Sequence, residues 1–268
     1  YLTGKIRKLG RVDHKDAYLD TYNLERERGI TIFSKQAEFE LGNRGITLLD
    51  TPGHVDFSAE MERTLQVLDY AILVINGADG VQGHTMTLWR LLARYQIPTF
   101  LFINKMDQDG TDKEKLLAEL KKRLTDNCVD FTWGKSDLQS QFLEDISVCD
   151  EELLEKYLET EEISTADIQK VIKERKLFPC FFGSALKMTG VEEFLHGLEK
   201  YCETPTYPSE FGAKVFKIAR DDQGNRLSYM KITGGTLKVK ELLTDTEKAD
   251  QIRIYSGAKF ELAKEAPA

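Results

Sequence analysis

The chain has 268 residues, 41% hydrophobic and 31% charged, which fits one mid-sized globular domain plus part of a second. No apolar run approaches the roughly 18 residues of a membrane helix, and there is no secretory signal, so we expect a cytoplasmic protein without a membrane partner. The net charge of -8 argues against a protein that coats nucleic acid non-specifically with its whole surface, and we expect no DNA partner, although a local basic face can still dock on a large RNA assembly. Four widely spaced cysteines are predicted to be reduced and mostly buried: Cys128, Cys149, Cys180 and Cys202.

The first residues, Tyr1 to Lys5, look like the end of a helix entered midway, so we expect further sequence upstream. The charged segment 26–32 precedes the first apolar run. A threonine there, Thr31, can order the loop by reaching a metal and a γ-phosphate in a triphosphate state. Without other motifs, residues 26–28 would indicate only a solvated charge run.

Four apolar runs, each ending in polar or glycine-rich residues, predict strands buried on both faces: 46–49, 70–75, 99–103 and 177–182. Helix-period stretches lie between them, at 85–95, 113–124 and 191–201. The alternation predicts an α/β fold with a mostly parallel sheet, whose ligand-binding residues gather at the carboxyl ends of the strands. The charged stretch 145–176 favours a solvated helical insertion. Beyond the linker around Pro205 and Pro208, alternating strands and a turn predict an antiparallel barrel over 209–268.

A D-T-P-G-H sequence follows the first apolar run. Asp50 can hold Mg²⁺ through water, because Mg²⁺ keeps most of its hydration shell. Gly53 lets a backbone N–H approach a γ-phosphate. His54 can orient the attacking water, the kind of positioning that phosphoryl transfer needs.

An N-K-M-D sequence follows the third apolar run. The Asp107 carboxylate can accept two hydrogen bonds from guanine, a pair of donors that adenine lacks. Asn104 can hold the base edge and tie loops together, and the stem of Lys105 can cover the base face. After the last run, a tight turn at Ser184 can present the Ala185 N–H to guanine O6.

A phosphate-cradling G-x-x-x-x-G-K-[ST] loop is not found in this sequence. The one G-K-S, at 134–136, has Val129 in place of the required first glycine, and no strand feeds it. We therefore reject it and expect the phosphate loop ahead of Tyr1.

Residues 26–32, 50–54, 104–107 and 183–185 resemble, in order and spacing, the nucleotide motifs of translational GTPases. Residues 50–109 most resemble tetracycline-resistance ribosomal protection proteins and their elongation factor G relatives. The long excursion between Asp107 and Ser184 also resembles the protection-protein group.

The resemblance implies a P-loop-type GTPase domain over 1–204 and part of a translation-factor barrel over 209–268. It implies GTP, GDP and Mg²⁺ as ligands, with hydrolysis triggered by RNA of the large ribosomal subunit. Thr31 would bind the metal, Asp50 would hold it through water, and His54 would position water beside an apolar gate that includes Ile30. Family members that eject tetracycline use a later domain, which these residues do not include.

Our leading hypothesis is therefore a ribosome-dependent GTPase of the protection-protein or elongation factor G type. One alternative is a non-catalytic ribosome- or partner-binding fragment that lacks the phosphate loop. Another is a peptide-release GTPase, which would share the same motifs. An ATPase is disfavoured, because Asp107 would face adenine without matching donors.

Overall fold

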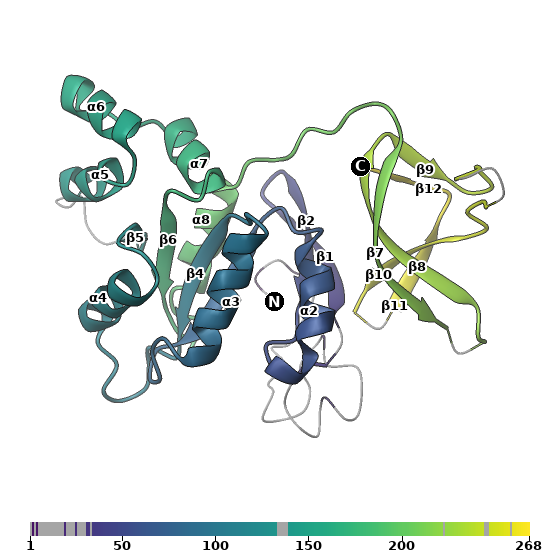
Figure 1. Ribbon diagram of the computed structural model, residues 1–268, viewed down its shortest axis with the longest axis horizontal. Coiled ribbons are helices and arrows are strands. Elements are labelled where there is room, and N and C mark those ends of the chain that lie inside the picture. The colour runs from purple at the N-terminus through teal and green to yellow at the C-terminus, as the bar shows by residue number, and fades with distance from the viewer. Residues whose placement is uncertain are drawn as a thin grey trace. The chain divides into compact units, whose positions relative to one another are not determined.

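The computed structural model describes residues 2, 4, 19, 25, 31, 32, 34–132, 139–221, 223–243, 247–257 and 259–268, without the side chains of Val55 and Gln139. These residues form two compact units (Figure 1). One unit is drawn from 1–67 together with 205–268, and the other spans 68–204. The predicted domains, 1–204 and 209–268, are continuous in sequence, whereas one compact unit combines two separate segments. The predicted boundaries therefore stay a prediction.

The 68–204 unit is built on a four-stranded parallel sheet with the order β3-β4-β6-β5. Its strands and helices are β3 (Ala71–Asn76), α3 (Gly83–Arg94), β4 (Thr99–Asn104), α4 (Lys113–Arg123), β5 (Cys128–Asp130), α5 (Gln139–Ser147), α6 (Glu151–Thr160), α7 (Thr165–Lys173), β6 (Phe178–Phe182) and α8 (Val191–Tyr201). The continuous apolar sequences of β4 and β6 are buried on both faces, as predicted.

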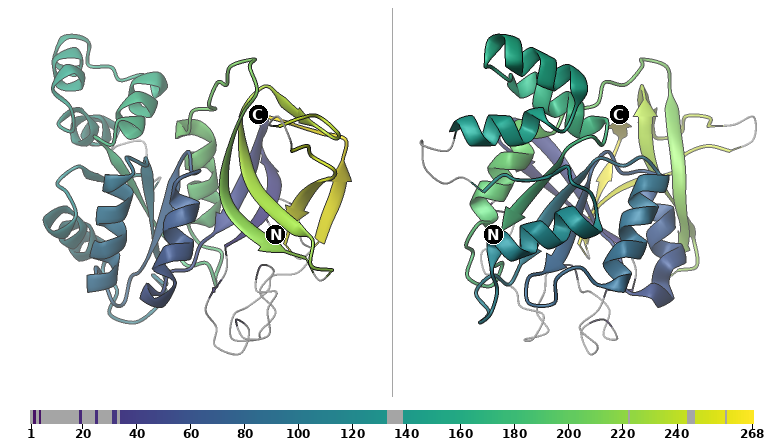
Figure 2. Two further views of the ribbon diagram at one scale, coloured as in Figure 1. Left: turned by 45° about the vertical axis from the view of Figure 1, so that its right-hand side comes forward. Right: turned by 60° about the vertical axis from the view of Figure 1, so that its left-hand side comes forward.

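Helices cover both faces of this sheet (Figure 2). On the α3 face, the ring of Trp89 lies edge-on 4.7 Å from Phe178. On the α8 face, the ring centroid of Phe194 lies 5.1 Å from that of Phe102 and 5.2 Å from that of Phe181. The strand alternation thus sends Phe178 and Phe181 into different layers, and each layer anchors a helix.

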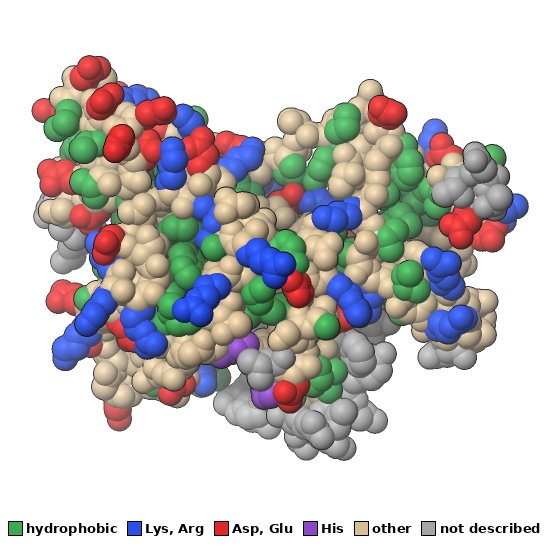
Figure 3. All heavy atoms as spheres, viewed as in Figure 1, with side chains coloured by type: hydrophobic (Ala, Val, Ile, Leu, Met, Phe, Trp, Pro, Cys, Tyr) green, Lys and Arg blue, Asp and Glu red, His purple; other side chains and the backbone are tan. Residues whose placement is uncertain are grey.

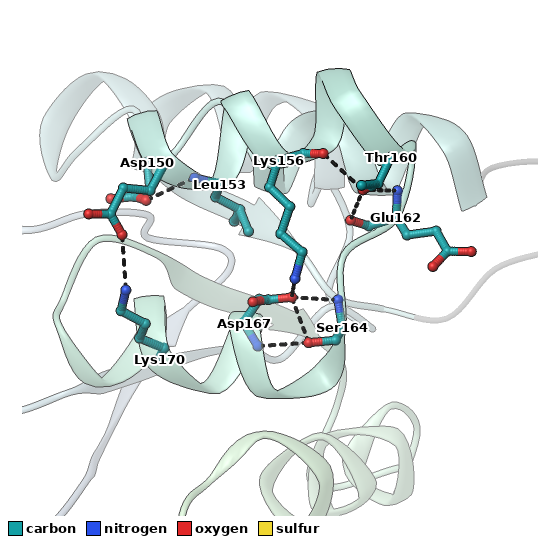
Figure 4. Close-up of polar contacts among 9 residues, drawn as sticks. Asp150, Leu153, Lys156, Thr160, Glu162, Ser164, Asp167 and Lys170 are labelled. Atoms are coloured by element: carbon teal, nitrogen blue, oxygen red, sulfur yellow. Dashed lines mark hydrogen bonds and ion pairs between the residues drawn. The ribbon is translucent and has the colours of Figure 1, made fainter.

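The predicted helical insertion corresponds to α5, α6 and α7. Its inner side chains, including Ile146, Leu153 and Ile168, belong to the same core cluster as Phe181. Acidic and basic side chains gather on its outer surface (Figure 3). The Ser164 and Asp167 side chains form a capping box at the start of α7, and Lys156 of α6 binds Asp167 at 2.6 Å (Figure 4). The insertion therefore has an apolar inner face and a charged outer one.

The first apolar run has an antiparallel partner that we did not predict. It forms β2 (Arg44–Asp50), which pairs antiparallel with β1 (Lys35–Leu41). Its predicted place in the parallel sheet stays a prediction. In β3, Leu73 and Ile75 are buried, whereas Val74 is 58% exposed. Within the described residues, β3 is an edge strand that pairs with β4 alone. Burial on both faces, as predicted from its apolar sequence, is therefore wrong for β3.

The other unit contains β1, β2, the short helix η1 (Val55–Phe57), α2 (Ser58–Leu65) and six further strands. These strands are β7 (Gly212–Arg220), β8 (Arg226–Gly234), β9 (Thr236–Lys238), β10 (Ile252–Ser256), β11 (Lys259–Ala263) and β12 (Glu265–Pro267). They form three antiparallel pairs, β7–β8, β10–β11 and β9–β12. This pairing agrees with the predicted change from parallel to antiparallel structure.

The cysteines are free thiols, and three of the four are buried, as predicted. Burial raises the pKa of Cys149 to about 12, which keeps that thiol protonated at neutral pH. None of the helices in the described part of the chain combines the length and apolar composition that crossing a bilayer requires.

Candidate nucleotide site

Asn104 joins the carboxyl ends of three neighbouring strands. It ends β4, and its side-chain Oδ1 accepts hydrogen bonds from the backbone N–H of Lys105 at 2.8 Å and of Ala185 at 2.9 Å. Its carbonyl oxygen accepts the N–H of Gly77, which follows β3, at 2.7 Å. The loops after β3, β4 and β6 are therefore fastened to one another through a single residue.

Lys105 adopts a left-handed conformation with φ of 63°, which is uncommon for a residue other than glycine. Two backbone hydrogen bonds hold it there. The Lys105 N–H donates to Asn104 Oδ1, and the N–H of the following residue, Met106, donates to Gly183 O at 3.0 Å. The Lys105 side chain is exposed beside this turn. The backbone thus fixes where the stem of Lys105 leaves the loop.

Two glycines allow these loops to approach closely. A Cβ on Gly183 would lie 2.3 Å from Thr189 O, and a Cβ on Gly77 would lie 2.9 Å from the sulfur of Met106. Gly183 has no room for a side chain unless the backbone moves, whereas a Cβ on Gly77 would first displace the Met106 side chain. The sequence interpretation named Ser184 and Ala185 but missed Gly77, whose only signal was its place directly after an apolar strand.

Asp107 is exposed at the tip of the β4 loop. A hydrogen bond from the buried Ser184 hydroxyl holds the pKa of its carboxyl below the usual value, and the nearby charge of Lys187 acts in the same direction. Asp107 is therefore an ionised acceptor at neutral pH. A charged acceptor beside the Ala185 N–H suits a ring that offers two donors and one carbonyl oxygen.

Thr31 and Asp50 meet in the other unit. The Thr31 hydroxyl lies 3.3 Å from Asp50 Oδ2, and Asp50 is the last residue of β2. Nearby, the fully buried Glu25 accepts the Ile32 N–H at 3.0 Å and forms an ion pair with Lys35. The sequence interpretation did not find Glu25, which directly precedes the 26–28 segment that would indicate only a solvated charge run without other motifs. Thr31 and Ile32 are thus each held by a carboxylate, Thr31 by Asp50 and Ile32 by Glu25.

This pair of oxygen ligands fits Mg²⁺. A hydroxyl and a carboxylate side by side are hard oxygen donors, and Mg²⁺ takes few protein ligands, with waters and phosphates as the rest. The described residues contain no group of three or more His, Cys, Asp or Glu side chains able to hold a metal by themselves. The donor set therefore suits a metal shared with a phosphate better than one enclosed by protein.

His54 is half exposed on the loop between β2 and α2. Its Nδ1 accepts the Asp56 N–H at 3.3 Å and lies 3.4 Å from the Asp56 carboxylate. Because Nδ1 is turned toward Asp56, Nε2 lies on the opposite edge of the ring. Among the described residues, nothing lies within 4 Å of where a Cβ on Gly53 would stand.

The predicted residues thus form two clusters. Asn104, Lys105, Asp107, Ser184 and Ala185 lie together in the 68–204 unit. Thr31, Asp50, Gly53 and His54 lie in the other unit, and Ile30 falls outside the described residues. The convergence of both clusters on one ligand stays a prediction.

Comparison with known proteins connects both clusters with one family. Residues 1–204 match the profile described as "Elongation factor Tu GTP binding domain". A crystal structure of a Thermus thermophilus protein has the same fold, with a TM-score of 0.87 at 22% identity over 100% of this chain and 48% of that one.

Three curated relatives cover most of the chain. The tetracycline resistance protein TetO of Campylobacter jejuni is 34% identical over 95% of this chain and 42% of its own length. TetP of Clostridium perfringens is 34% identical over 90% of this chain and 40% of its own length. Elongation factor G of Ureaplasma urealyticum is 31% identical over 95% of this chain and 46% of its own length. The predicted resemblance is confirmed. The chain spans less than half the length of each of these relatives.

Proposed function

Because the chain belongs to the family of elongation factor Tu GTP binding domains, we propose that it binds GTP and GDP with Mg²⁺ and hydrolyses GTP on the ribosome. The observation that carries the proposal is the linked loop set after β3, β4 and β6, where Asn104 fixes the Ala185 N–H beside the ionised Asp107. That arrangement offers guanine a charged acceptor and a backbone donor at one edge of the sheet.

Guanine binding uses groups that are already oriented. Asp107 accepts from the ring N–H and the exocyclic amine, and adenine would leave this carboxylate unpaired. The Ala185 N–H, now donated to Asn104 Oδ1, is the donor for guanine O6. Lys105 covers one face of the base with its apolar stem. Such a site binds adenine far more weakly than guanine, because adenine would leave the hydrogen-bonding groups of the site without partners.

In the hydrolytic step, the protein supplies orientation. Thr31 and Asp50 would hold the metal, Asp50 through water, and Mg²⁺ would supply positive charge against the phosphates. Gly53 offers a backbone N–H to the γ-phosphate. His54 orients the attacking water through Nε2, since Nδ1 is turned toward Asp56. The apolar gate at Ile30 belongs to the same proposal.

The similarity to tetracycline resistance proteins and elongation factor G supports a ribosomal role in the cytoplasm. We place the trigger for hydrolysis in the RNA of the large ribosomal subunit, with no role for DNA or a membrane. Protection from tetracycline and translocation are the two candidate tasks of the whole protein.

The test uses the longest natural chain that contains this sequence. We expect GTP hydrolysis that rises with added ribosomes, and the Asp107→Ala variant should lose guanine-nucleotide affinity by orders of magnitude while its far-UV circular dichroism is unchanged. The Asp109→Ala variant, two residues along the same loop, is the matched control. Unchanged GDP affinity in Asp107→Ala would remove the base-recognition assignment, and turnover that ignores ribosomes would remove the ribosomal one.

A further inference from the structure

Glu60, in the first turn of α2, connects three segments that are far apart in the sequence. Its carboxylate accepts the Ser34 N–H at 3.3 Å and the Lys217 ammonium at 2.6 Å, and lies 3.6 Å from Arg63. The Glu60 and Lys217 side chains are only 14% and 16% exposed. Ser34 lies just after the Thr31 segment, and Lys217 belongs to β7.

A second contact ties Ser34 to α2. The Ser34 and Thr64 hydroxyls lie 2.7 Å apart, and Thr64 is 1% exposed. The chain that leaves Thr31 is therefore attached to α2 at two points, one turn apart on the same helix face. Because α2 follows the loop that carries His54, these contacts link the two halves of the Thr31–His54 cluster.

Two further lysines of the β7–β8 hairpin bind the other end of α2. Lys214 donates to Gln66 O at 3.0 Å, and Lys231 donates to Val67 O at 3.1 Å. Both carbonyls lie where the helix has just ended and its backbone acceptors have no intrahelical partner, which is where cations are favourable.

A β-bulge brings these lysines to one face. In a regular strand, Lys214 and Lys217 would point to opposite faces, because side chains alternate. The register of β7 against β8 shifts between Val215 and Lys217, so the extra residue reverses the alternation and both lysines reach α2. Lys214 and Lys231 are directly paired across the hairpin.

We propose that the Glu60–Lys217 pair is a positioning element that couples the β7–β8 hairpin to the Thr31 segment and to the loop bearing His54. Displacement of the hairpin by a partner then moves α2 and, with it, the groups that orient the attacking water. The catalytic consequence rests on the proposed function, whereas the mechanical coupling does not. Glu60 and Lys217 touch no reacting atom, so they act on turnover and not on nucleotide affinity.

The test compares Lys217→Met, which removes the charge and keeps an apolar stem, with Lys217→Arg, which keeps the charge. Lys170→Met, which breaks the exposed pair with Glu152, is the matched control. In the longest natural chain, we expect Lys217→Met to lower ribosome-stimulated kcat about tenfold, a loss typical of misplaced catalytic groups, with GDP affinity within about twofold of the original. Lys217→Arg and Lys170→Met should keep both values.

Hydrogen–deuterium exchange of the 54–67 segment separates the possible failures. We expect faster exchange there in Lys217→Met and in Glu60→Gln. The increase in the double variant should be smaller than the sum of the two, because both substitutions remove the same ion pair while Glu60 also contacts Ser34 and Arg63. Exchange equal to that of the original protein would overturn the coupling. Faster exchange with unchanged kcat would overturn the positioning role. If the unsubstituted protein shows no ribosome-stimulated hydrolysis, the proposed function fails. The exchange rates of the 54–67 segment in the variants then still test whether the Glu60–Lys217 pair couples the hairpin to α2.

Discussion

Replacing Asn104 with alanine tests whether this side chain holds the base-recognition loops together. The substitution leaves the backbone N–H groups of Lys105 and Ala185 without their acceptor. Two ordinary hydrogen bonds together contribute about 2 kcal/mol. Because both N–H groups belong to exposed residues, water can replace part of the lost hydrogen bonding, and we expect the free energy of opening the loop to fall by about 1 kcal/mol. That corresponds to roughly fivefold faster hydrogen exchange in the 183–188 loop if opening is local.

The Asn104→Asp variant separates the structural role from the recognition role. It is nearly isosteric and keeps the Oδ acceptor, so both N–H bonds remain and exchange in the 183–188 loop should stay close to the original rate. It loses the amide donor that holds the base edge, so GDP affinity should fall in both variants. Equal exchange rates in Asn104→Ala and the unsubstituted protein would refute the view that Asn104 fastens the loops.

Three further predictions follow from other parts of the structure. His54→Ala should keep GTP binding and lose ribosome-stimulated turnover by about 10² or more, measured as phosphate release; normal turnover would exclude His54 from the mechanism. Gly183→Ala should weaken GDP binding, because its Cβ would lie 2.3 Å from Thr189 O, and tight binding in this variant would mean that the loop yields easily. Burial opposes ionisation of Asp167, but hydrogen bonds from Lys156 and Ser164 outweigh it and lower its pKa from 3.8 to about 2. The ionised form therefore stabilises the fold above pH 4 and ceases to do so as the pH falls toward 2. The Asp167→Asn variant should lose about 1 kcal/mol of unfolding free energy at neutral pH in urea, and this loss should shrink between pH 4 and pH 2. A loss that does not change with pH would contradict the role of the ionised carboxylate.

The sequence predicted β4, β6 and the loops that follow them, because strands buried on both faces have continuous apolar sequences and the polar residues directly after them are unmistakable. The antiparallel β1–β2 hairpin was missed. Its signal was the turn between the two strands, where Gly42 has a φ of 57° and is followed by Asn43, a pair typical of tight hairpins. The apolar run of β2 does not by itself indicate this antiparallel partner.

The Glu60 contacts could not be predicted. Glu60 and Lys217 are 157 positions apart, and nothing in their local sequence pairs them. Regular alternation would place Lys214 and Lys217 on opposite faces of β7. The bulge between Val215 and Lys217, which the sequence does not reveal, brings them to one face. Spacing rules describe local periodicity, whereas this cluster depends on tertiary register.

Guanine specificity is the central claim, and competition binding tests it most directly. Fluorescent GDP would be bound with Mg²⁺ to the longest natural chain that contains this sequence, and displaced in turn by unlabelled GTP and ATP. We predict displacement by GTP at orders of magnitude lower concentration than by ATP, and loss of this preference in Asp107→Ala. Equal displacement by the two nucleotides, or GDP binding that survives Asp107→Ala unchanged, would contradict the account.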